Sequence, residues 1–260
     1  MDKRTFRIGQ IADVHLIADN DEADHLKSVE SFEKTLADAD KFDLDLLVIS
    51  GDMTEHSFPQ EYQLFFEMMK AYSGKWCMIA GNHDKSADIA RYSPFPIELH
   101  HGEYFYKKTV NEVALFFLDS STDSVSKSQL EWLKEEAAKE SKEIFIFMHH
   151  PPCLCGHLFM DSRYALKNWN ETKSVMEEIP NLRAIFTGHY HSAMEVNLEN
   201  GKKVYLTPAT QMQLNPDVSE FNIISTVPGW RYIEYKNEKI STELRYLWLC
   251  SLKWLLTSLK

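Results

Sequence analysis

The sequence predicts an α/β fold in which two β-sheets pack face to face with helices on their outer sides. Short apolar stretches, typical of buried strands, alternate with helical patterns through the first half of the chain. Strand-like segments dominate the second half. No repeat, low-complexity tract or linker divides the 260 residues, a length that fits one large domain or two small ones.

The first half of the chain alternates strands and helices. An apolar strand is followed by an acidic loop containing Asp19, Asp21, Glu22 and Asp24, and later helices begin beside Pro59 and Ser126, residues suited to helix starts. Asn111-Glu112 predicts a turn between two paired strands. The strands are expected at Thr5–Ile11, Leu44–Ser50, Trp76–Ala80, Tyr104–Lys108, Val113–Leu118 and Ile144–Met148, and the first helix at Leu26–Ala39.

The second half is expected to be richer in strands. A long loop is predicted from Pro151 to about Asn168, and a helix over Glu171–Glu178 ends before Pro180. The remaining strands are expected at Ala184–Phe186, Glu195–Leu198, Lys203–Leu206 and Arg231–Tyr235.

Composition limits the partners. The net charge of −11 disfavours a nucleic-acid polymer, because phosphate contacts need Lys and Arg, but it leaves room for a small phosphate ester at a metal site. The opening residues MDKRTF lack the apolar core of a secretion signal, which predicts a cytoplasmic protein. The four cysteines are too few and too scattered for a disulfide framework.

Five clusters of metal-ligand residues each follow a predicted strand. In open α/β sheets such strand ends build the site, so the clusters should meet at one sheet edge. Carboxylates, imidazoles and one amide suit a pair of divalent metals. The clusters are Asp13-Val14-His15, Gly51-Asp52, Gly81-Asn82-His83-Asp84, His149-His150-Pro151-Pro152 and Gly188-His189-Tyr190-His191.

Spacing suggests which side chains act together. Asp13 and His15 are two residues apart and can face one ion, as can His189 and His191, and Asp52 could bridge two ions. Each pair alone would more often be a surface turn or a buried core histidine. Five such clusters at successive strand ends make a common site the better explanation.

Other positions keep two interpretations. His83 could bind metal or act as a proton donor that also contacts a phosphate oxygen, and Asp84 could orient His83 or cap the following turn. Successive residues of an extended segment point to opposite sides, so one of His149 and His150 is expected to be a ligand.

The order DVH, GD, GNHD, HH, GHYH resembles the calcineurin-like metallophosphoesterases over about residues 5–235. The resemblance implies a four-layer α/β/β/α sandwich and a binuclear centre of Fe, Mn, Zn or Co, in which a metal-bridging hydroxide attacks phosphorus. It implies catalytic roles for His83 and Asp84, substrate binding by Asn82, His83 and His150, and selects His149 over His150 as a ligand. The implied metal ligands are Asp13, His15, Asp52 and His191 for one ion, and Asp52, Asn82, His149 and His189 for the other.

Within the family, the chain is most similar to bacterial cyclic-nucleotide phosphodiesterases of the cAMP type. The similarity lies in LDSS, QLEWL, MHHPP, TPAT with Gln213, and PGWRYIE. A small phosphodiester, most simply a 3′,5′-cyclic nucleotide, is the expected substrate. The alternatives are a glycerophosphodiester or lipid-headgroup diester, and a catalytically inactive binding scaffold.

Two further segments carry expectations. Cys153-Leu154-Cys155 could bind a soft metal but is expected to be ordinary loop. The metallophosphoesterase domain is expected over residues 1–243. The apolar and basic tail Leu244–Lys260 is expected to be a helix that packs on its own domain or forms a homodimer contact, in preference to lying on a membrane.

Overall fold

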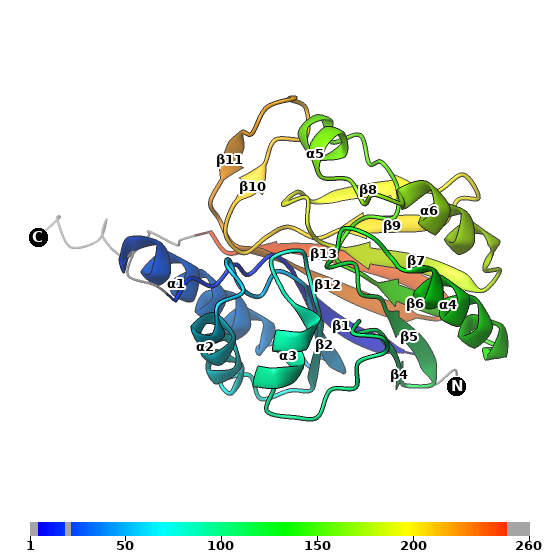
Figure 1. Ribbon diagram of the computed structural model, residues 1–260, viewed down its shortest axis with the longest axis horizontal. Helices are drawn as coiled ribbons and strands as arrows, with labels where there is room; N and C mark the ends of the chain where they lie inside the picture. The colour runs from blue at the N-terminus through cyan, green and yellow to red at the C-terminus, as the bar shows by residue number, and fades with distance from the viewer. Residues whose placement is uncertain (1–4, 19–21, 249–260) are drawn as a thin grey trace, which may run out of the picture.

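The computed structural model describes residues 5–18 and 22–248 (Figure 1). One sheet has the strand order β13-β12-β1-β2-β3, with β1, β2 and β3 parallel and β12 and β13 antiparallel. Its strands are β1 (Phe6–Ile11), β2 (Leu46–Ser50), β3 (Trp76–Ile79), β12 (Gly229–Lys236) and β13 (Lys239–Tyr246).

The second sheet has the order β4-β5-β6-β7-β9-β8, in which β5, β6, β7 and β9 are parallel. A separate ribbon is formed by β10 and β11. These strands are β4 (Tyr106–Val110), β5 (Val113–Phe117), β6 (Ile144–Phe147), β7 (Leu182–Thr187), β8 (Met194–Asn197), β9 (Lys203–Leu206), β10 (Gln213–Leu214) and β11 (Ile223–Ser225).

Helices cover the outer face of each sheet, as Figure 1 shows. The first three lie against the five-stranded sheet, whereas α4 and α6 lie against the six-stranded one. The helices are α1 (Glu22–Ala39), α2 (Pro59–Met69), α3 (Ser86–Tyr92), α4 (Lys127–Lys139), α5 (Leu158–Arg163) and α6 (Trp169–Glu178).

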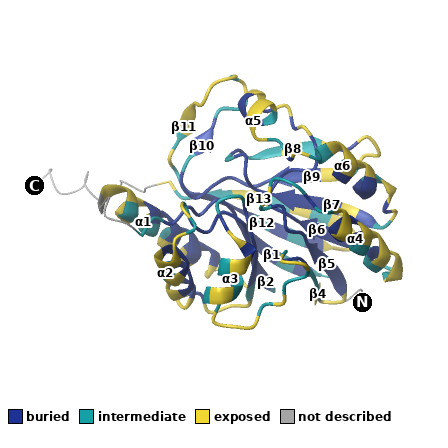
Figure 2. Ribbon diagram, viewed as in Figure 1, coloured by how far each residue is buried: buried dark blue, intermediate teal, exposed yellow. Residues whose placement is uncertain are grey.

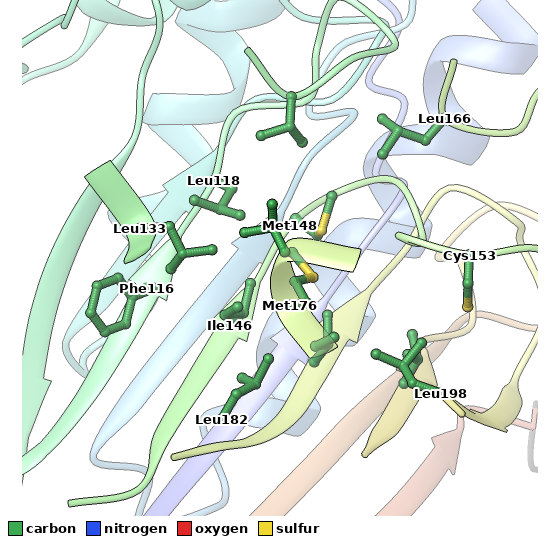
Figure 3. Packing of buried hydrophobic residues seen from close by; sticks show 14 of the residues in the cluster. Phe116, Leu118, Leu133, Ile146, Met148, Cys153, Leu166, Met176, Leu182 and Leu198 are labelled. Atoms are coloured by element: carbon green, nitrogen blue, oxygen red, sulfur yellow. The ribbon is translucent and has the colours of Figure 1, made fainter. Parts of the chain in front are cut away.

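The alternation of strand side chains builds three apolar layers between these four layers of backbone. In β6, Phe145 and Phe147 face the other sheet, whereas Ile144 and Ile146 face the helices. Figure 3 shows the helix-side cluster, where Ile146 lies near Met176. Figure 2 shows the same result over the whole molecule, with buried strands inside and exposed helix surfaces outside. The predicted four-layer α/β/β/α sandwich is therefore confirmed.

The parallel strands explain the position of the site. The strands β1, β2 and β3 of one sheet and β5, β6 and β7 of the other end at the same side of the molecule, where the loops carry the predicted ligands. The turn at Asn111-Glu112 is also confirmed, and both residues have positive φ (47° and 66°), as the tight turn between antiparallel β4 and β5 requires.

Three local expectations were wrong. Helix α1 begins at Glu22, so Glu22 and Asp24 belong to the helix and not to an acidic loop. The predicted loop after Pro151 contains α5, whose start is capped by His157 through the amide of Met160. Acidic residues are favourable in the first turn of a helix, and a side chain that accepts a hydrogen bond from a first-turn amide caps the helix start. In both places the sequence was interpreted as loop.

Strand β13 was also missed. Residues Leu244–Tyr246 pair with Gly229–Arg231 of β12, so the predicted tail helix does not begin at Leu244. The side chain of Arg245 points back toward Asp38 of α1, with Nε and Oδ2 3.6 Å apart, which favours the strand. Residues 249–260 of the predicted tail lie outside the described residues. Over 5–18 and 22–248, no helix combines the length and apolar character needed to cross a membrane.

Candidate metal centre and active-site pocket

The five clusters meet at one point. Three overlapping groups bring their ligand atoms within 4.8 Å of one another. Atoms Nε2 of His15 and His191 are 3.1 Å apart, and Nε2 of His149 is 3.1 Å from Oδ2 of Asp52. The groups are Asp13, His15 and His191; His15, Asp52 and His83; and Asp52, His149 and His189.

The donor set around His149 fits a cation. Its Nδ1 donates to the carbonyl of Ser50 at 2.9 Å, so in the neutral ring Nε2 carries no hydrogen. Two oxygens face that lone pair, Oδ2 of Asp52 at 3.1 Å and Oδ1 of Asn82 at 3.2 Å. Three acceptors that converge without a hydrogen repel one another unless a positive charge lies among them. A divalent ion would supply that charge.

Glu55 contacts the second histidine pair, His15 and His191, through His15. Its Oε2 lies 2.7 Å from Nδ1 of His15, and Nε2 on the other side of the same ring lies 3.1 Å from Nε2 of His191. Carboxylates that hold a histidine in this way are typical around protein metal sites. Sequence analysis missed Glu55, although its place three residues after Asp52 could have suggested it.

The same proximity disturbs proton affinities in the metal-free protein. Although burial opposes it, the charge of Asp52 raises the pKa of His149 to about 9. Burial raises the pKa of Asp13 to about 6, and burial together with the charge of His15 lowers that of His191 to about 3. Strongly shifted and coupled groups in one cleft mark a functional site.

Backbone strain marks the same residues. Five of the predicted ligands have positive φ, a conformation that residues with a Cβ rarely adopt. Each such residue costs roughly 1–2 kcal/mol, so the surrounding packing must impose the conformation. The values are 54° for Asp13, 48° for His15, 51° for Asp52, 68° for His189 and 48° for His191.

The glycines of the motifs provide clearance between neighbouring loops. A Cβ on Gly51 would lie 2.5 Å from Nδ1 of His149, and one on Gly81 would lie 2.2 Å from Oδ1 of Asp52. Both distances are far below contact, so any side chain at either position would displace a predicted ligand. Each of these two glycines is thus a packing requirement for a ligand that belongs to another motif.

His83 stands beside the ligands at the cavity wall. Its backbone amide donates to Oδ1 of Asp52 at 2.8 Å, and its Nδ1 lies 2.7 Å from the carbonyl of Glu55. The side chain is 35 % exposed, unlike the buried histidines around it. With Nδ1 held by a carbonyl, Nε2 is the atom left to exchange a proton.

Asp84 has a different role from the catalytic one expected. Its oxygens accept from the amides of Gly81 at 3.0 Å, Met53 at 3.1 Å and Thr54 at 3.2 Å, and from the Thr54 hydroxyl at 3.1 Å. The side chain is buried, and these four donors occupy it. Asp84 therefore joins the loops that carry Asp52 and Asn82, and it does not orient the His83 ring.

His150 does not line the pocket. The ring is fully buried, with Nδ1 2.9 Å from Oγ of Ser120 and Nε2 3.5 Å from Oδ1 of Asp123. It packs behind His189, with ring centroids 4.0 Å apart. The substrate-binding role expected for His150 is therefore replaced by support of His189, because no surface of the ring faces the cavity.

A cavity of about 340 Å³ lies over the predicted ligands. One side is formed by five of the predicted ligands with Glu55 and His83, whereas the opposite wall is apolar and partly aromatic; the five are His15, Asp52, Asn82, His189 and His191. The members of this wall come from α5 and the β10–β11 ribbon with the residues beside them, and they meet only in the folded chain. The wall consists of Phe159, Met160, Tyr164, Met212, Leu214 and Phe221.

Cys153 and Cys155 are free, buried thiols, as is Cys77. The thiol of Cys155 contacts the carbonyl of Cys153 at 3.3 Å. Neither belongs to any of the potential metal-binding groups found among the described residues, and their role as ordinary loop residues stays a prediction.

The fold and this centre define a class of protein: the chain belongs to the calcineurin-like phosphoesterase family, whose model matches residues 6–193. It is therefore a metal-dependent phosphoester hydrolase. It is 38 % identical over 246 residues to a probable cyclic nucleotide phosphodiesterase of Fibrobacter succinogenes, covering 95 % of this chain and 96 % of the relative.

Two further similarities agree with this family. The chain is 29 % identical over 256 residues to the 3′,5′-cyclic adenosine monophosphate phosphodiesterase CpdA of Escherichia coli K12, covering 93 % of this chain and 90 % of the relative. A dimetal phosphatase from Danio rerio has the same fold, with a TM-score of 0.71 at 12 % identity, covering 93 % of this chain and 96 % of the other.

Proposed function

We propose that the chain hydrolyses 3′,5′-cyclic nucleotides to 5′-nucleotides with two bound metal ions. The observation that carries the proposal is one cavity with a floor of converging metal-ligand atoms and a wall of aromatic and apolar side chains. Such a cavity suits a molecule that has a phosphodiester at one end and a flat ring at the other. Relatives named as cyclic nucleotide phosphodiesterases support the same assignment.

Seven side chains would hold the two ions. Bound ions would activate a water and neutralise charge on the phosphoryl oxygens. We assign Asp52 to both ions, since its Oδ2 lies 3.1 Å from Nε2 of His149 and 3.6 Å from Nε2 of His15, which belong to the two different ligand sets. The other ligands are Asp13, His15 and His191 for one ion, and Asn82, His149 and His189 for the other.

His83 would complete the reaction. When water adds to phosphorus, the P–O3′ bond breaks and the leaving 3′-oxygen needs a proton. Because Nδ1 of His83 is held by the carbonyl of Glu55, its Nε2 would deliver that proton. The metal identities, the cytoplasmic location and the homodimer stay predictions.

The test is hydrolysis of 3′,5′-cAMP and bis-p-nitrophenyl phosphate with added Mn²⁺. We expect the wild type to cleave both and Asn82→Ala to lose both activities together with metal. Asn170→Ala, an exposed change on α6, is the matched control. Cleavage of the artificial diester alone would remove the cyclic-nucleotide assignment and leave the phosphodiesterase chemistry.

One observation favours a second candidate, a glycerophosphodiester or lipid-headgroup substrate. Several large apolar residues on and beside α5 and the β10–β11 ribbon are exposed, and Figure 2 shows that much of this lobe is exposed. They could contact a lipid surface. Turnover of glycerophosphoethanolamine faster than cAMP would favour this candidate. The residues are Leu154, Leu158, Tyr164, Phe221, Ile223 and Ile224.

A further inference from the structure

Three aromatic rings form the wall that faces the metal ligands. Phe159 of α5 lies between the other two, with ring centroids 5.5 Å from Tyr164 and 5.9 Å from Phe221. A bond from the amide of Leu158 to the carbonyl of Pro216 joins α5 to the segment that leads into the ribbon. Figure 1 shows α5 and the β10–β11 ribbon together on one lobe of the molecule. The wall is therefore built by tertiary contacts and is in place before substrate binds.

The two outer rings of the wall, Tyr164 and Phe221, are exposed, unlike the aromatic residues of the core. Tyr164 is 50 % exposed and Phe221 58 % exposed, whereas Phe159 behind them is only 7 % exposed. Large apolar faces in water are unfavourable, and a planar ligand that covers them recovers that free energy. The rings face the site of the phosphodiester across the cavity. They would therefore contact the part of the substrate that lies beyond the scissile bond.

The wall offers area for stacking but almost nothing that distinguishes one base edge from another. Among its described side chains, the Tyr164 hydroxyl is the one polar group, and the remaining members are Phe, Met and Leu. Reading a base needs paired donors and acceptors, as the amides of Asn and Gln or a guanidinium provide.

The two glutamines nearest the wall already use their Nε2 donors. Gln211 donates to the carbonyl of Val14 at 2.9 Å. Gln213 donates to the carbonyls of Ala209 and Val227, and its own oxygen is buried. These hydrogen bonds hold the segment around β10 in place.

The nearby cation is directed elsewhere as well. The guanidinium of Arg163 lies over the Phe159 ring, 5.1 Å from its centroid. Arg163 lines a smaller adjoining cavity of about 110 Å³, which shares Asn82, Tyr164 and His189 with the main one. Its guanidinium is stacked on the central ring of the wall and is absent from the lining of the main cavity.

We propose that this wall binds the nucleobase by its face alone, so that the enzyme accepts purine and pyrimidine 3′,5′-cyclic nucleotides alike. The inference rests on the proposed cyclic-nucleotide activity and specifies its substrate range. Stacking tolerates any base because every base has a π-face. Sites that discriminate by about 10⁴-fold do so with buried hydrogen-bonding groups, which this wall lacks. The values of kcat/KM for cAMP, cGMP and cCMP should therefore agree within about tenfold.

The experiment compares those three substrates with ribose 3′,5′-cyclic phosphate, which has the same diester and no base. We expect the base-free compound to have kcat/KM lower by about 5- to 150-fold, the range that stacking of one base on an aromatic side chain provides. Phe221→Ala should raise KM for all three nucleotides by a similar factor, leave kcat within about threefold, and leave the base-free compound almost unaffected. Phe95→Ala, an exposed change outside the cavity, is the control.

The outcomes separate the two proposals. If kcat/KM for cAMP exceeds that for cGMP or cCMP by more than about tenfold, face-only binding is wrong and the cyclic-nucleotide activity stands. If Phe221→Ala lowers turnover of the base-free compound as much as that of cAMP, the ring supports the fold and does not bind the base. If bis-p-nitrophenyl phosphate is cleaved but no cyclic nucleotide is, the proposed function itself fails.

Discussion

Replacing Asp84 by Asn tests whether this residue is structural or catalytic. The carboxylate receives four donors: Thr54 gives its amide and hydroxyl to Oδ1, and Met53 and Gly81 give their amides to Oδ2. Asparagine keeps one acceptor oxygen and replaces the other by an NH₂ group. The arrangement of lower energy places the NH₂ group at the position of Oδ1. There the Thr54 hydroxyl can rotate and accept a hydrogen bond from the NH₂ group, and only the Thr54 amide loses its acceptor.

The magnitude follows from this count. One unpaired buried amide costs about 1–3 kcal/mol, and the two remaining bonds lose their charged acceptor, for a total of about 2–4 kcal/mol. For a chain of this size each kcal/mol shifts Tm by about 2–4 °C, so a fall of about 5–15 °C is expected. Turnover measured well below Tm should stay within about tenfold, because Asp84 contacts no reacting group.

The assay is thermal unfolding beside single-temperature kinetics with bis-p-nitrophenyl phosphate. Asp43→Asn is the matched control, since the Asp43 side chain is 97 % exposed and pairs only with Arg7 at the surface. An unchanged Tm with turnover lowered a thousandfold would refute the structural reasoning and restore the catalytic role for Asp84.

Three further predictions concern the metal centre and the core. Glu55→Gln should weaken metal binding by about 10–100-fold in calorimetric titration, with exposed Glu67→Gln unaffected, because the carboxylate holds His15; equal affinities would remove that role. Removing the metal with a chelator should lower Tm by about 5–10 °C for each site, if the free metal concentration was about a hundred times the Kd of that site. An unchanged Tm would count against bound ions. Ile146→Ala should cost about 2–5 kcal/mol in denaturant unfolding, since the side chain is fully buried between β6 and the helices; a cost under about 1 kcal/mol would contradict the packing in Figure 3.

The layered core could be predicted because its pattern is local. The runs around Ile146 and Val48 are apolar at every position, which is what a strand covered on both faces requires. The candidate ligands could be found for a similar reason. Each lies within five residues of a predicted strand end, so the sheet brings them to one edge.

The contact between α5 and the β10–β11 ribbon across the pocket wall could not be predicted in this way. Phe221 meets Phe159 across sixty residues of chain, and nothing in either local sequence distinguishes a wall residue from a core residue. Strand β13 was missed because Leu244–Tyr246 has an apolar and basic pattern that a helix also satisfies, and pairing with β12 decides between them. The role of Asp84 depended on which donors surround it, and these come from another loop.

The clearance provided by the motif glycines bears on how such a site can be engineered. Gly81 makes room for Asp52, Gly51 makes room for His149, and Gly188 would place a Cβ 2.9 Å from Oδ2 of Asp13. Each short motif is thus shaped by a residue that belongs to another. Grafting a single loop from a distant homologue would change one half of such a contact and leave the other half mismatched. Two loops that contact each other should therefore be exchanged together, because this centre should not tolerate the exchange of either one alone.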